Sequence, residues 1–238
     1  MIQFMTFVEK HSRWIVPLLG LFVLAPITPY LDIKLSGFFY DPKSSTFTNN
    51  AFYYLVYHYA QLPGFIVFGA ALLGLCLSYI KKSLTPYRNS FLVLVLAMAI
   101  GPGLVINVLL KPGWGRPRPR QIEEFSGSEK YRAFYAPNFG YNKADKYKSF
   151  PSGHASMGFY FFVFAVMGAR VGDRRMVYAA TATALTLGII LGITRIAQGG
   201  HFFSDIIVAA LVTWWSALIV DWMIFSDAYC ERLNRKTA

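Results

Sequence analysis

The 238-residue chain is 55% hydrophobic and only 15% charged, whereas soluble domains carry about 25% charged residues. This composition excludes a disordered or collagen-like chain, and two cysteines are too few for a disulfide-framed secreted module. A mean hydropathy of +0.41 predicts a polytopic helical membrane protein, whose loops and tails account for the net charge of +11 without nucleic-acid binding.

Six apolar windows are long enough to cross, or nearly cross, a hydrocarbon core about 30 Å thick. In chain order they are Trp14–Leu31, Leu62–Ile80, Phe91–Leu110, Ala155–Ala169, Met176–Thr194 and Ile206–Phe225. The fourth window is short, and we expect it to extend back to Gly153. We therefore predict an all-α fold with six transmembrane helices, forming a single domain over residues 1–238.

Two features interrupt this pattern. The aromatic-rich stretch Phe38–Gln61 suits the membrane interface, where we expect a short surface helix at Ala51–Tyr59. The sequence Gly101-Pro102-Gly103 predicts a bend in the third helix.

Positive charge predicts the topology. The short loops Lys81–Ser90 and Arg170–Arg175 are rich in lysine and arginine, so the positive-inside rule places them, and with them both termini, in the cytoplasm. In any six-helix arrangement, the loops after the third and fifth helices open on one shared side, which is here the outer side.

A first cationic cluster follows the third helix, in the sequence Lys111-Pro-Gly-Trp-Gly-Arg116-Pro117-Arg118-Pro119-Arg120. Such a segment often meets lipid head groups without any further role. However, prolines stiffen the run, so we expect Lys111, Arg116 and Arg118 to form a fixed fan that suits an anion of definite shape, such as a phosphoryl group.

A second cluster, Ser149-Phe150-Pro151-Ser152-Gly153-His154, precedes the fourth helix. Ser152 can serve simply as a helix cap, and a lone histidine at this depth is often interfacial. Next to Gly153, however, the exposed N–H groups of a helix start form an anion cradle. His154 then lies in the first turn, facing the bound anion.

The third cluster joins the fifth and sixth helices and runs from Thr194-Arg195 to His201 and Asp205. If His201 opens the sixth helix, Asp205 lies at i+4 on the same face and can accept the imidazole N–H. This pair is either a helix-stabilising contact or the geometry of a histidine nucleophile. Arg195 adds a partner for phosphate oxygens.

Together, these motifs resemble the signature of the type 2 phosphatidic acid phosphatase (PAP2) family, which includes vanadium haloperoxidases. The matching positions, all within residues 111–205, are Lys111 with Arg118-Pro119, then Pro151-Ser152-Gly153-His154, then Arg195 with His201 and Asp205. One departure is Thr194, where the family usually has serine. The resemblance implies a PAP2/haloperoxidase-like helical core.

The resemblance also implies roles for these residues in a phosphatase that requires neither a metal nor a cofactor. His201 would attack phosphorus to form a phosphohistidine, Asp205 would orient its ring, and His154 would protonate the leaving oxygen. The phosphate oxygens would be bound by Lys111, Arg118, Ser152, Gly153 and Arg195. Outside this pattern, Arg116 would hold a second charged group of the substrate.

Further stretches resemble bacterial lipid A phosphatases of the 4′-phosphatase type. They are Leu31-Asp32-Ile33, Gly37-Phe38-Phe39-Tyr40, Ile100-Gly101-Pro102-Gly103-Leu104-Val105 and the segment Gln198 to Asp205. This likeness implies lipid A as the substrate, at the periplasmic face of a bacterial inner membrane. Undecaprenyl pyrophosphate, phosphatidylglycerol phosphate and phosphatidic acid remain alternatives. The long cationic loop, with Arg132, Lys143, Lys146 and Lys148, favours a multiply anionic head group.

Two other classes fit less well. A transporter needs ionisable groups near the bilayer midplane, and we expect only Asp221 to be an intramembrane charge. A haloperoxidase would use the same anion cage, but a membrane-embedded site suits a lipid ester better than halide oxidation.

Overall fold

The computed structural model describes residues 2–139 and 147–237, with residues 2–11 and 227–237 described by their backbone alone. Almost all regular structure in this part of the chain is helical, as predicted. The elements before the long loop are α1 (Ile2–Leu24), η1 (Ala25–Ile27), α2 (Thr28–Gly37), β1 (Tyr40–Asp41), β2 (Thr46–Phe47), α3 (Ala51–Tyr59), α4 (Leu62–Leu77), η2 (Lys82–Tyr87), α5 (Arg88–Met98), η3 (Ala99–Leu110) and α6 (Lys111–Gly113). Those after it are η4 (Pro119–Gln121), η5 (Glu123–Phe125), α7 (Gly153–Phe159), α8 (Phe162–Val171), α9 (Arg174–Ala197) and α10 (Phe203–Thr237).

Six segments are long and apolar enough to span a membrane, which confirms the predicted number. They are Ser12–Gly37, Ala51–Leu77, Lys82–Gly113, Gly153–Val171, Arg174–Ala197 and Phe203–Ser226. The fourth begins at Gly153, as expected, while the first continues past Leu31 through α2. This extension places Asp32 within a membrane span.

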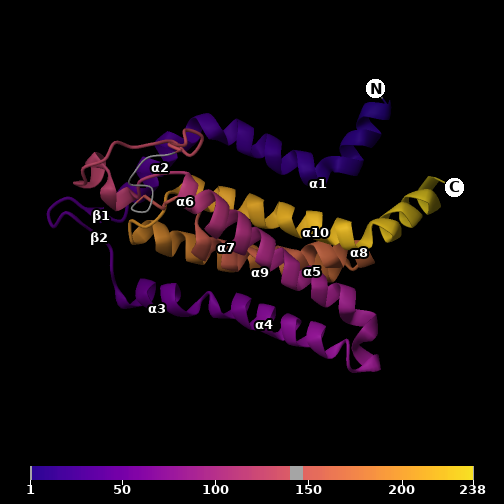
Figure 1. Cartoon of the computed structure of the whole chain (residues 1–238). Helices are drawn as coiled ribbons and strands as arrows, with labels where there is room; N and C mark the ends of the chain where they lie inside the picture. The colour runs from indigo at the N-terminus through magenta and orange to yellow at the C-terminus, as the bar shows by residue number, and fades with distance from the viewer. Residues whose placement is uncertain (1, 140–146, 238) are drawn as a thin grey trace.

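Helix α3 forms where a helix was predicted, but its orientation differs from the expectation of a surface helix. α3 and α4 run almost in line and form one span, Ala51–Leu77 (Figure 1). The side-chain oxygen of Asn50 caps α3 by accepting a hydrogen bond from the backbone N–H of Tyr53, at 3.1 Å. Because α3 is mostly apolar and aromatic, it continues the span and carries its aromatic side chains to the end of the bundle.

The Gly-Pro-Gly sequence in the third span changes the winding of the helix. Residues Ala99–Leu110 form the π-helix η3, in which the backbone has a wider turn. Pro102 has no N–H to donate, and its own carbonyl accepts a hydrogen bond from the Asn107 side chain at 2.7 Å. This turn positions Asn107 and Lys111 near the start of α7.

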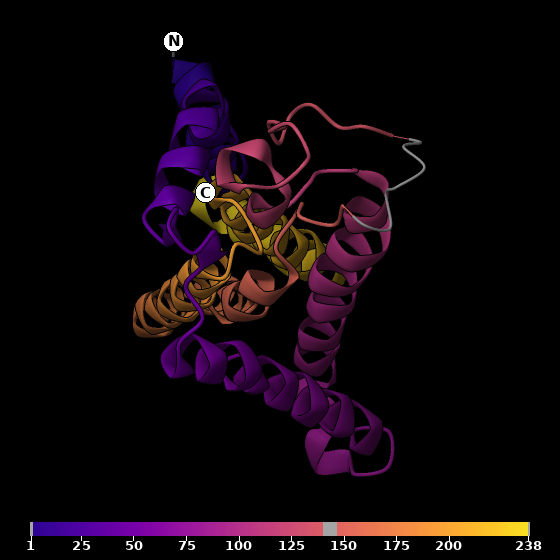
Figure 2. The same cartoon turned by 90° about the vertical axis from the view of Figure 1, so that its left-hand side faces the viewer.

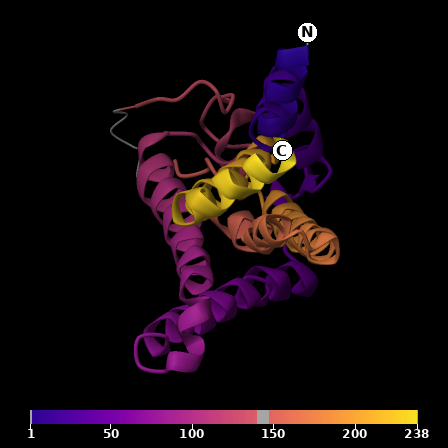
Figure 3. The same cartoon turned by 90° about the vertical axis from the view of Figure 1, so that its right-hand side faces the viewer.

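Helices α7 and α8 form the centre of the bundle, with α9 packed along one side and α5 and α10 along others (Figure 1). In the most apolar windows of the fourth and sixth spans, 61% and 56% of residues are buried, compared with 6% and 11% in the first and second. The first two spans are therefore peripheral, and Figures 2 and 3 show α1 and the α3–α4 pair on separate sides of the central helices.

The loops that carry the motifs gather at one end of the bundle. Figure 1 shows α2, α6, the β1–β2 hairpin and the segment before α10 together at this end, while both chain termini lie toward the other. This arrangement confirms that the three motif clusters share one side. Lys143 and Lys146, which we included in the cationic loop, lie outside the described residues.

Candidate active site

Direct contacts join the three sequence motifs. The backbone N–H of Ser152 donates to the carbonyl of Asp205 at 3.2 Å, which ties the second motif to the third. The backbone N–H of Arg120 donates to the carbonyl of Gly199 at 3.2 Å, which ties the first motif to the third. Residues 53 positions apart (152 and 205) and 79 positions apart (120 and 199) are therefore in direct contact within one site.

The second motif forms the start of α7. Ser152 is the N-cap, and its hydroxyl oxygen accepts a hydrogen bond from the backbone N–H of Ala155 at 3.4 Å. The helix begins at Gly153, so His154 lies in its first turn, as predicted. The Ser152 side chain is fully buried, so its capping role stabilises the helix start from the protein side.

Gly153 is required by close packing at this helix start. A Cβ atom at this position would lie 2.8 Å from Asn107 Oδ1 and 3.2 Å from Lys111 Nζ. The missing side chain therefore lets the Lys111 ammonium group approach the α7 N-terminus, where positive charge and free N–H groups favour an anion. Asn107 was not predicted as part of this site.

His201 is buried in the segment between α9 and α10. Helix α10 begins at Phe203, so His201 lies just before the sixth helix and not within its first turn. Its Nδ1 atom lies 2.5 Å from the carbonyl oxygen of Ser149 and 3.6 Å from Asp205 Oδ2. Since a carbonyl can only accept, the proton lies on Nδ1 and the Nε2 lone pair is free.

The electrostatic environment keeps the His201 imidazole neutral. Burial lowers its pKa to about 3, although the Asp205 carboxylate acts in the opposite direction. The positive charges of Arg195 and Lys111 also disfavour the protonated form of the ring. A neutral imidazole with a free nitrogen is the form that can act as a nucleophile at ordinary pH.

The Asp205 carboxylate is held mainly by groups other than the imidazole. Oδ1 accepts from Arg116 Nη1 at 2.5 Å, and Oδ2 accepts from Ser149 Oγ at 2.6 Å and from the Phe202 N–H at 2.8 Å. Ser149 therefore contacts both partners, Asp205 through its hydroxyl and His201 through its carbonyl. The carboxylate lies beside the imidazole as a fixed negative charge.

The structure contradicts the expectation that Arg116 binds substrate. Its side chain is fully buried, and Nη2 forms an ion pair with Asp32 Oδ2 at 2.7 Å while Nη1 pairs with Asp205. Nη1 also donates to Ser204 Oγ, and Nε donates to the Arg132 carbonyl, both at 2.8 Å. Although burial opposes the charged form, the two carboxylates raise the pKa of Arg116. The Arg116 side chain is therefore held by protein groups and is not available to a substrate.

Asp32 completes this buried network, which sequence reasoning missed. Besides the ion pair, its Oδ2 atom accepts from Tyr131 Oη at 2.8 Å and Ser204 Oγ at 2.7 Å, while Oδ1 accepts from the Ser204 N–H at 2.8 Å. Asp32 also lies within a candidate span, Ser12–Gly37, near the end that meets the motif loops. The first span thus contributes a charge to the end of the bundle where the motif loops gather, which we call the catalytic end.

Arg195 lies in the last turn of α9 and is 7% exposed. Nη1 donates to Gln198 Oε1 at 2.6 Å, while the buried Nε has no hydrogen-bond partner among the described residues. A Cβ atom on Gly200 would lie 2.2 Å from Nη2, so glycine is needed where the backbone passes the guanidinium. A buried donor without a partner is costly unless a ligand satisfies it, and phosphate oxygens would do so.

Lys111, Arg118 and Arg195 form a cationic cluster at this end. The charge of Lys111 is repelled by both arginines, and all three residues interact with His154. Burial and the charge of Arg120 lower the pKa of Arg118. Such close positive charges favour binding of a multiply charged anion.

Tyr57 of α3 links two of the predicted site residues. Its ring stacks on the His154 imidazole, with the centroids 4.4 Å apart and the planes inclined by 20°. The Arg195 guanidinium carbon lies 4.8 Å from the centre of the same ring. The aromatic first loop, for which the sequence predicted no function, therefore orients both His154 and Arg195.

A pocket of about 480 Å³ opens beside the cationic cluster. Its lining combines arginines, hydroxyl and amide side chains, and aromatic rings. The lining residues are Ser45, Thr46, Phe47, Thr48, Asn49, Tyr54, Tyr57, His58, Arg118, Arg120, Phe125, Arg195 and Gln198. Arg118 and Arg195 line this pocket, whereas the buried Arg116 does not.

Among the described residues, no three His, Cys, Asp or Glu side chains are grouped so that they could hold a metal ion. The acidic groups of the site are instead occupied by arginine, hydroxyl and backbone donors. Independence from metals stays a prediction, which requires an activity measurement.

Comparison with known proteins identifies the family. The sequence profile of the PAP2 superfamily matches residues 90–227. A lipid A 4′-phosphatase of Francisella tularensis subsp. novicida is 33% identical over 209 residues, covering 87% of this chain and 90% of the relative.

Two further relatives match about half of the chain. A lipid A 4′-phosphatase of Rhizobium leguminosarum is 31% identical, covering 52% of this chain and 48% of the relative. A lipid A 1-phosphatase of Rhizobium johnstonii is 33% identical, covering 49% of this chain and 41% of the relative. No solved structure matched the chain. With the family profile and the first relative each covering most of it, the chain belongs to the PAP2 superfamily as one of its membrane-spanning lipid phosphatases.

Proposed function

We propose that this protein removes the 4′-phosphate of lipid A through a phosphohistidine on His201, without a metal or cofactor. The observation that carries the proposal is the neutral, buried His201 with its Nδ1 proton directed at Ser149, beside a cluster of three cations. The relative similar over 87% of this chain is a lipid A 4′-phosphatase, which supports the substrate.

In the first step, His201 Nε2 attacks phosphorus, the N–P bond forms and the P–O bond to the sugar breaks. His154 donates a proton to the leaving oxygen, and its stacking on Tyr57 holds the ring in place. The charged phosphoimidazole is stabilised by the Asp205 carboxylate, 3.6 Å from Nδ1, and by the Ser149 carbonyl.

In the second step, water attacks the phosphohistidine and gives a proton to His154. The N–P bond breaks, inorganic phosphate leaves and His201 returns to its neutral form. Throughout both steps, Lys111, Arg118 and Arg195 and the N–H groups at the α7 start stabilise the phosphoryl oxygens, because phosphoryl transfer depends mainly on positioning and charge stabilisation.

The pocket beside the cations supports a phosphorylated sugar as head group. Its hydroxyl and amide side chains can bind sugar hydroxyls, and its aromatic rings can pack against a sugar ring. Since Arg116 is buried, we assign recognition of a second charged group to the exposed Arg120, which lines the pocket. This assignment makes bisphosphorylated lipid A a better substrate than a lipid with one phosphate.

We further propose that the whole chain acts as one catalytic domain, because Asp32 of the first span supports Asp205 of the last through Arg116. The protein would lie in the bacterial inner membrane with both termini in the cytoplasm. The catalytic end would then face the periplasm, in keeping with the positive short loops at the opposite end.

The first test measures phosphate release by purified protein in EDTA. The substrates are lipid A, undecaprenyl pyrophosphate, phosphatidylglycerol phosphate and phosphatidic acid, with His201→Ala as the control. We expect the protein to prefer lipid A and to remove the 4′-phosphate, as detected by mass spectrometry of the product. We also expect an acid-labile phosphoenzyme that His201→Ala does not form. Preference for another lipid would overturn the substrate, and removal of the 1-phosphate would overturn the position. Dependence on an added metal, or normal turnover by His201→Ala, would overturn the mechanism.

The Arg120 assignment has a separate test. Arg120→Gln should raise KM for bisphosphorylated lipid A about tenfold, the equivalent of one charge-assisted contact, and change KM for lipid A with only the 4′-phosphate much less. An equal increase for both substrates would contradict the assignment.

A further inference from the structure

A second pocket lies at the end of the bundle opposite to the catalytic cluster. Its volume is about 570 Å³, and it lies between α1, α8, α9 and α10. The lining residues are Arg13, Ala165, Val166, Ala169, Gly172, Asp173, Arg174, Val177, Tyr178, Thr181, Trp214 and Leu218. Arg13 and Arg174 lie at the starts of the first and fifth spans, which begin on the same side of the membrane.

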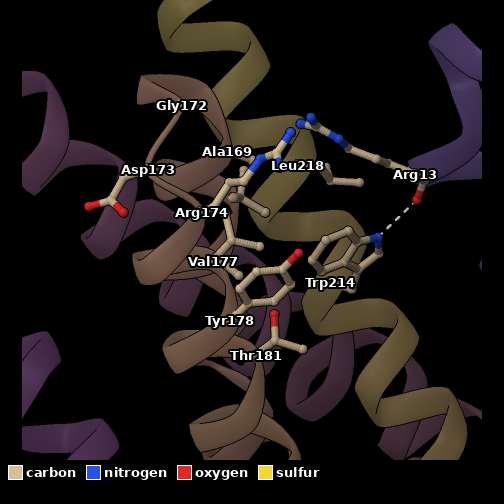
Figure 4. A pocket seen from close by; sticks show the side chains of 12 residues that line it. Arg13, Ala169, Gly172, Asp173, Arg174, Val177, Tyr178, Thr181, Trp214 and Leu218 are labelled. Atoms are coloured by element: carbon tan, nitrogen blue, oxygen red, sulfur yellow. Dashed lines mark hydrogen bonds between the residues drawn. The ribbon is translucent and has the colours of Figure 1, made fainter.

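Two arginines from different helices point toward the mouth of this pocket. Figure 4 shows the side chains of Arg13 and Arg174 converging there, with the Tyr178 hydroxyl directed toward them from below. Both arginines are exposed, and among the described residues neither forms an ion pair with an acidic side chain. Two converging guanidinium groups repel each other unless an anion lies between them.

The neighbouring acidic residues do not neutralise this pair. Asp173 lines the pocket, but its carboxylate accepts from the backbone N–H groups of Arg175 and Met176 and points away in Figure 4. Asp221 is bound by Arg170 Nε at 3.0 Å. The pocket therefore has a cationic mouth, whereas the charge of Arg170 is already paired.

Below the arginines, the pocket becomes apolar. Ala165, Val166 and Leu218 form its inner wall, and the Trp214 ring contributes another side while its Nε1–H donates to the Arg13 carbonyl at 2.9 Å. An arginine pair above an apolar wall at the end of membrane spans matches the two parts of a phospholipid, because basic pockets between transmembrane helices bind anionic head groups. Free phosphate would use the mouth alone.

We infer that this pocket binds an anionic phospholipid of the leaflet opposite to the catalytic site, with the lipid phosphate between Arg13 and Arg174 and an acyl chain against the apolar wall. The lipid would join α1 to α9 and α10. This matters because the first span is otherwise peripheral, with 6% of its window buried, yet it carries Asp32 to the catalytic end.

The test compares two double variants that each remove two positive charges from the same side of the membrane. Arg13→Gln/Arg174→Gln removes the pocket arginines. Lys81→Gln/Arg175→Gln removes two exposed cations that do not line the pocket. Binding of phosphatidylglycerol or phosphatidylcholine to each purified full-length protein is measured by native mass spectrometry, and thermal unfolding is measured with and without each lipid.

We expect phosphatidylglycerol to bind the unmodified protein and raise its unfolding temperature, while phosphatidylcholine does neither to the same extent. The pocket variant should lose roughly 100-fold in phosphatidylglycerol affinity, the equivalent of two charge-assisted contacts at about tenfold each. The control variant should lose less than about twofold. Equal losses in both variants, or none in the pocket variant, would overturn the inference.

Two further measurements separate the possible sources of the anion and exclude misfolding. Inorganic phosphate and glycerol phosphate are added in place of lipid, and stabilisation by either one at the concentration that suffices for phosphatidylglycerol would refute a lipid site. Arg13→Lys/Arg174→Lys keeps both charges, and partial recovery of phosphatidylglycerol binding would support the pocket as the origin of the loss. No recovery in a folded lysine variant would contradict a site based on these charges.

Discussion

Replacing Asp32 by asparagine tests whether the first span supports catalysis through the buried charge network. The Asp32 carboxylate accepts four hydrogen bonds, from Arg116, from Tyr131, and from both the hydroxyl and the N–H of Ser204. An asparagine side chain has a similar size, but it replaces one oxygen with a donor group. Its NH₂ group must therefore face at least one of these donors.

The expected cost follows from the geometry. Removing one member of a buried ion pair costs about 3–5 kcal/mol, and we expect the lower end because Arg116 keeps Asp205 at 2.5 Å. The released guanidinium can shift toward Asp205, and a displacement of about 1 Å near reacting groups can cost about 100-fold in rate. We therefore expect kcat to fall about 100-fold while KM changes little, because Asp32 does not line the substrate pocket.

The matched control is Asp221→Asn. Asp221 is also fully buried and bound by an arginine, Arg170, but it lies toward the far end of the last span. This variant should lose comparable stability and keep its kcat per folded molecule.

Thermal unfolding and the rate of phosphoenzyme formation are measured for both variants, with activity normalised to the folded fraction. If Asp32→Asn loses activity only in proportion to its folded fraction, the positioning role is refuted. An equal loss of kcat in Asp221→Asn would refute it as well.

Three further predictions concern the site itself. Gly153→Ala should weaken inhibition by vanadate, a phosphate mimic, about tenfold, because the new Cβ would lie 3.2 Å from Lys111 Nζ. Unchanged inhibition would contradict an anion site at the start of α7. Tyr57→Leu should lower kcat/KM about fivefold through loss of the contact with Arg195, while Tyr57→Phe should retain it; equal effects would assign the loss to the hydroxyl. The His201 ring should remain neutral from pH 8 to pH 5 in an NMR titration, since burial lowers its pKa to about 3, and titration near 6.5 would disprove the buried neutral form. The His201 pKa is lower in the folded protein than in the unfolded chain, so the unfolded chain takes up a proton first as the pH falls. The free energy of unfolding should therefore decrease as the pH falls from about 6.5 toward 3.

The linear sequence determined the number of spans and the side on which the motifs meet. Hydropathy is a local property averaged over some 20 residues, so the six windows predicted all six spans. Parity then placed the three motif loops at one end, as observed. The helix cap at Ser152 was also readable, because capping depends on residues within one turn.

Only the tertiary structure decided what each charged side chain contacts. Arg116 and Arg118 are two positions apart in a stiff, proline-rich run, yet Arg116 is buried between two aspartates while Arg118 lines the pocket. Local spacing could not distinguish them, because the partner Asp32 lies 84 positions earlier in the sequence. In the same way, Tyr57 reaches His154 only because α3 continues the second span to the catalytic end. Long-range packing brings these groups together, and such contacts cannot be predicted from the periodicity of a single sequence.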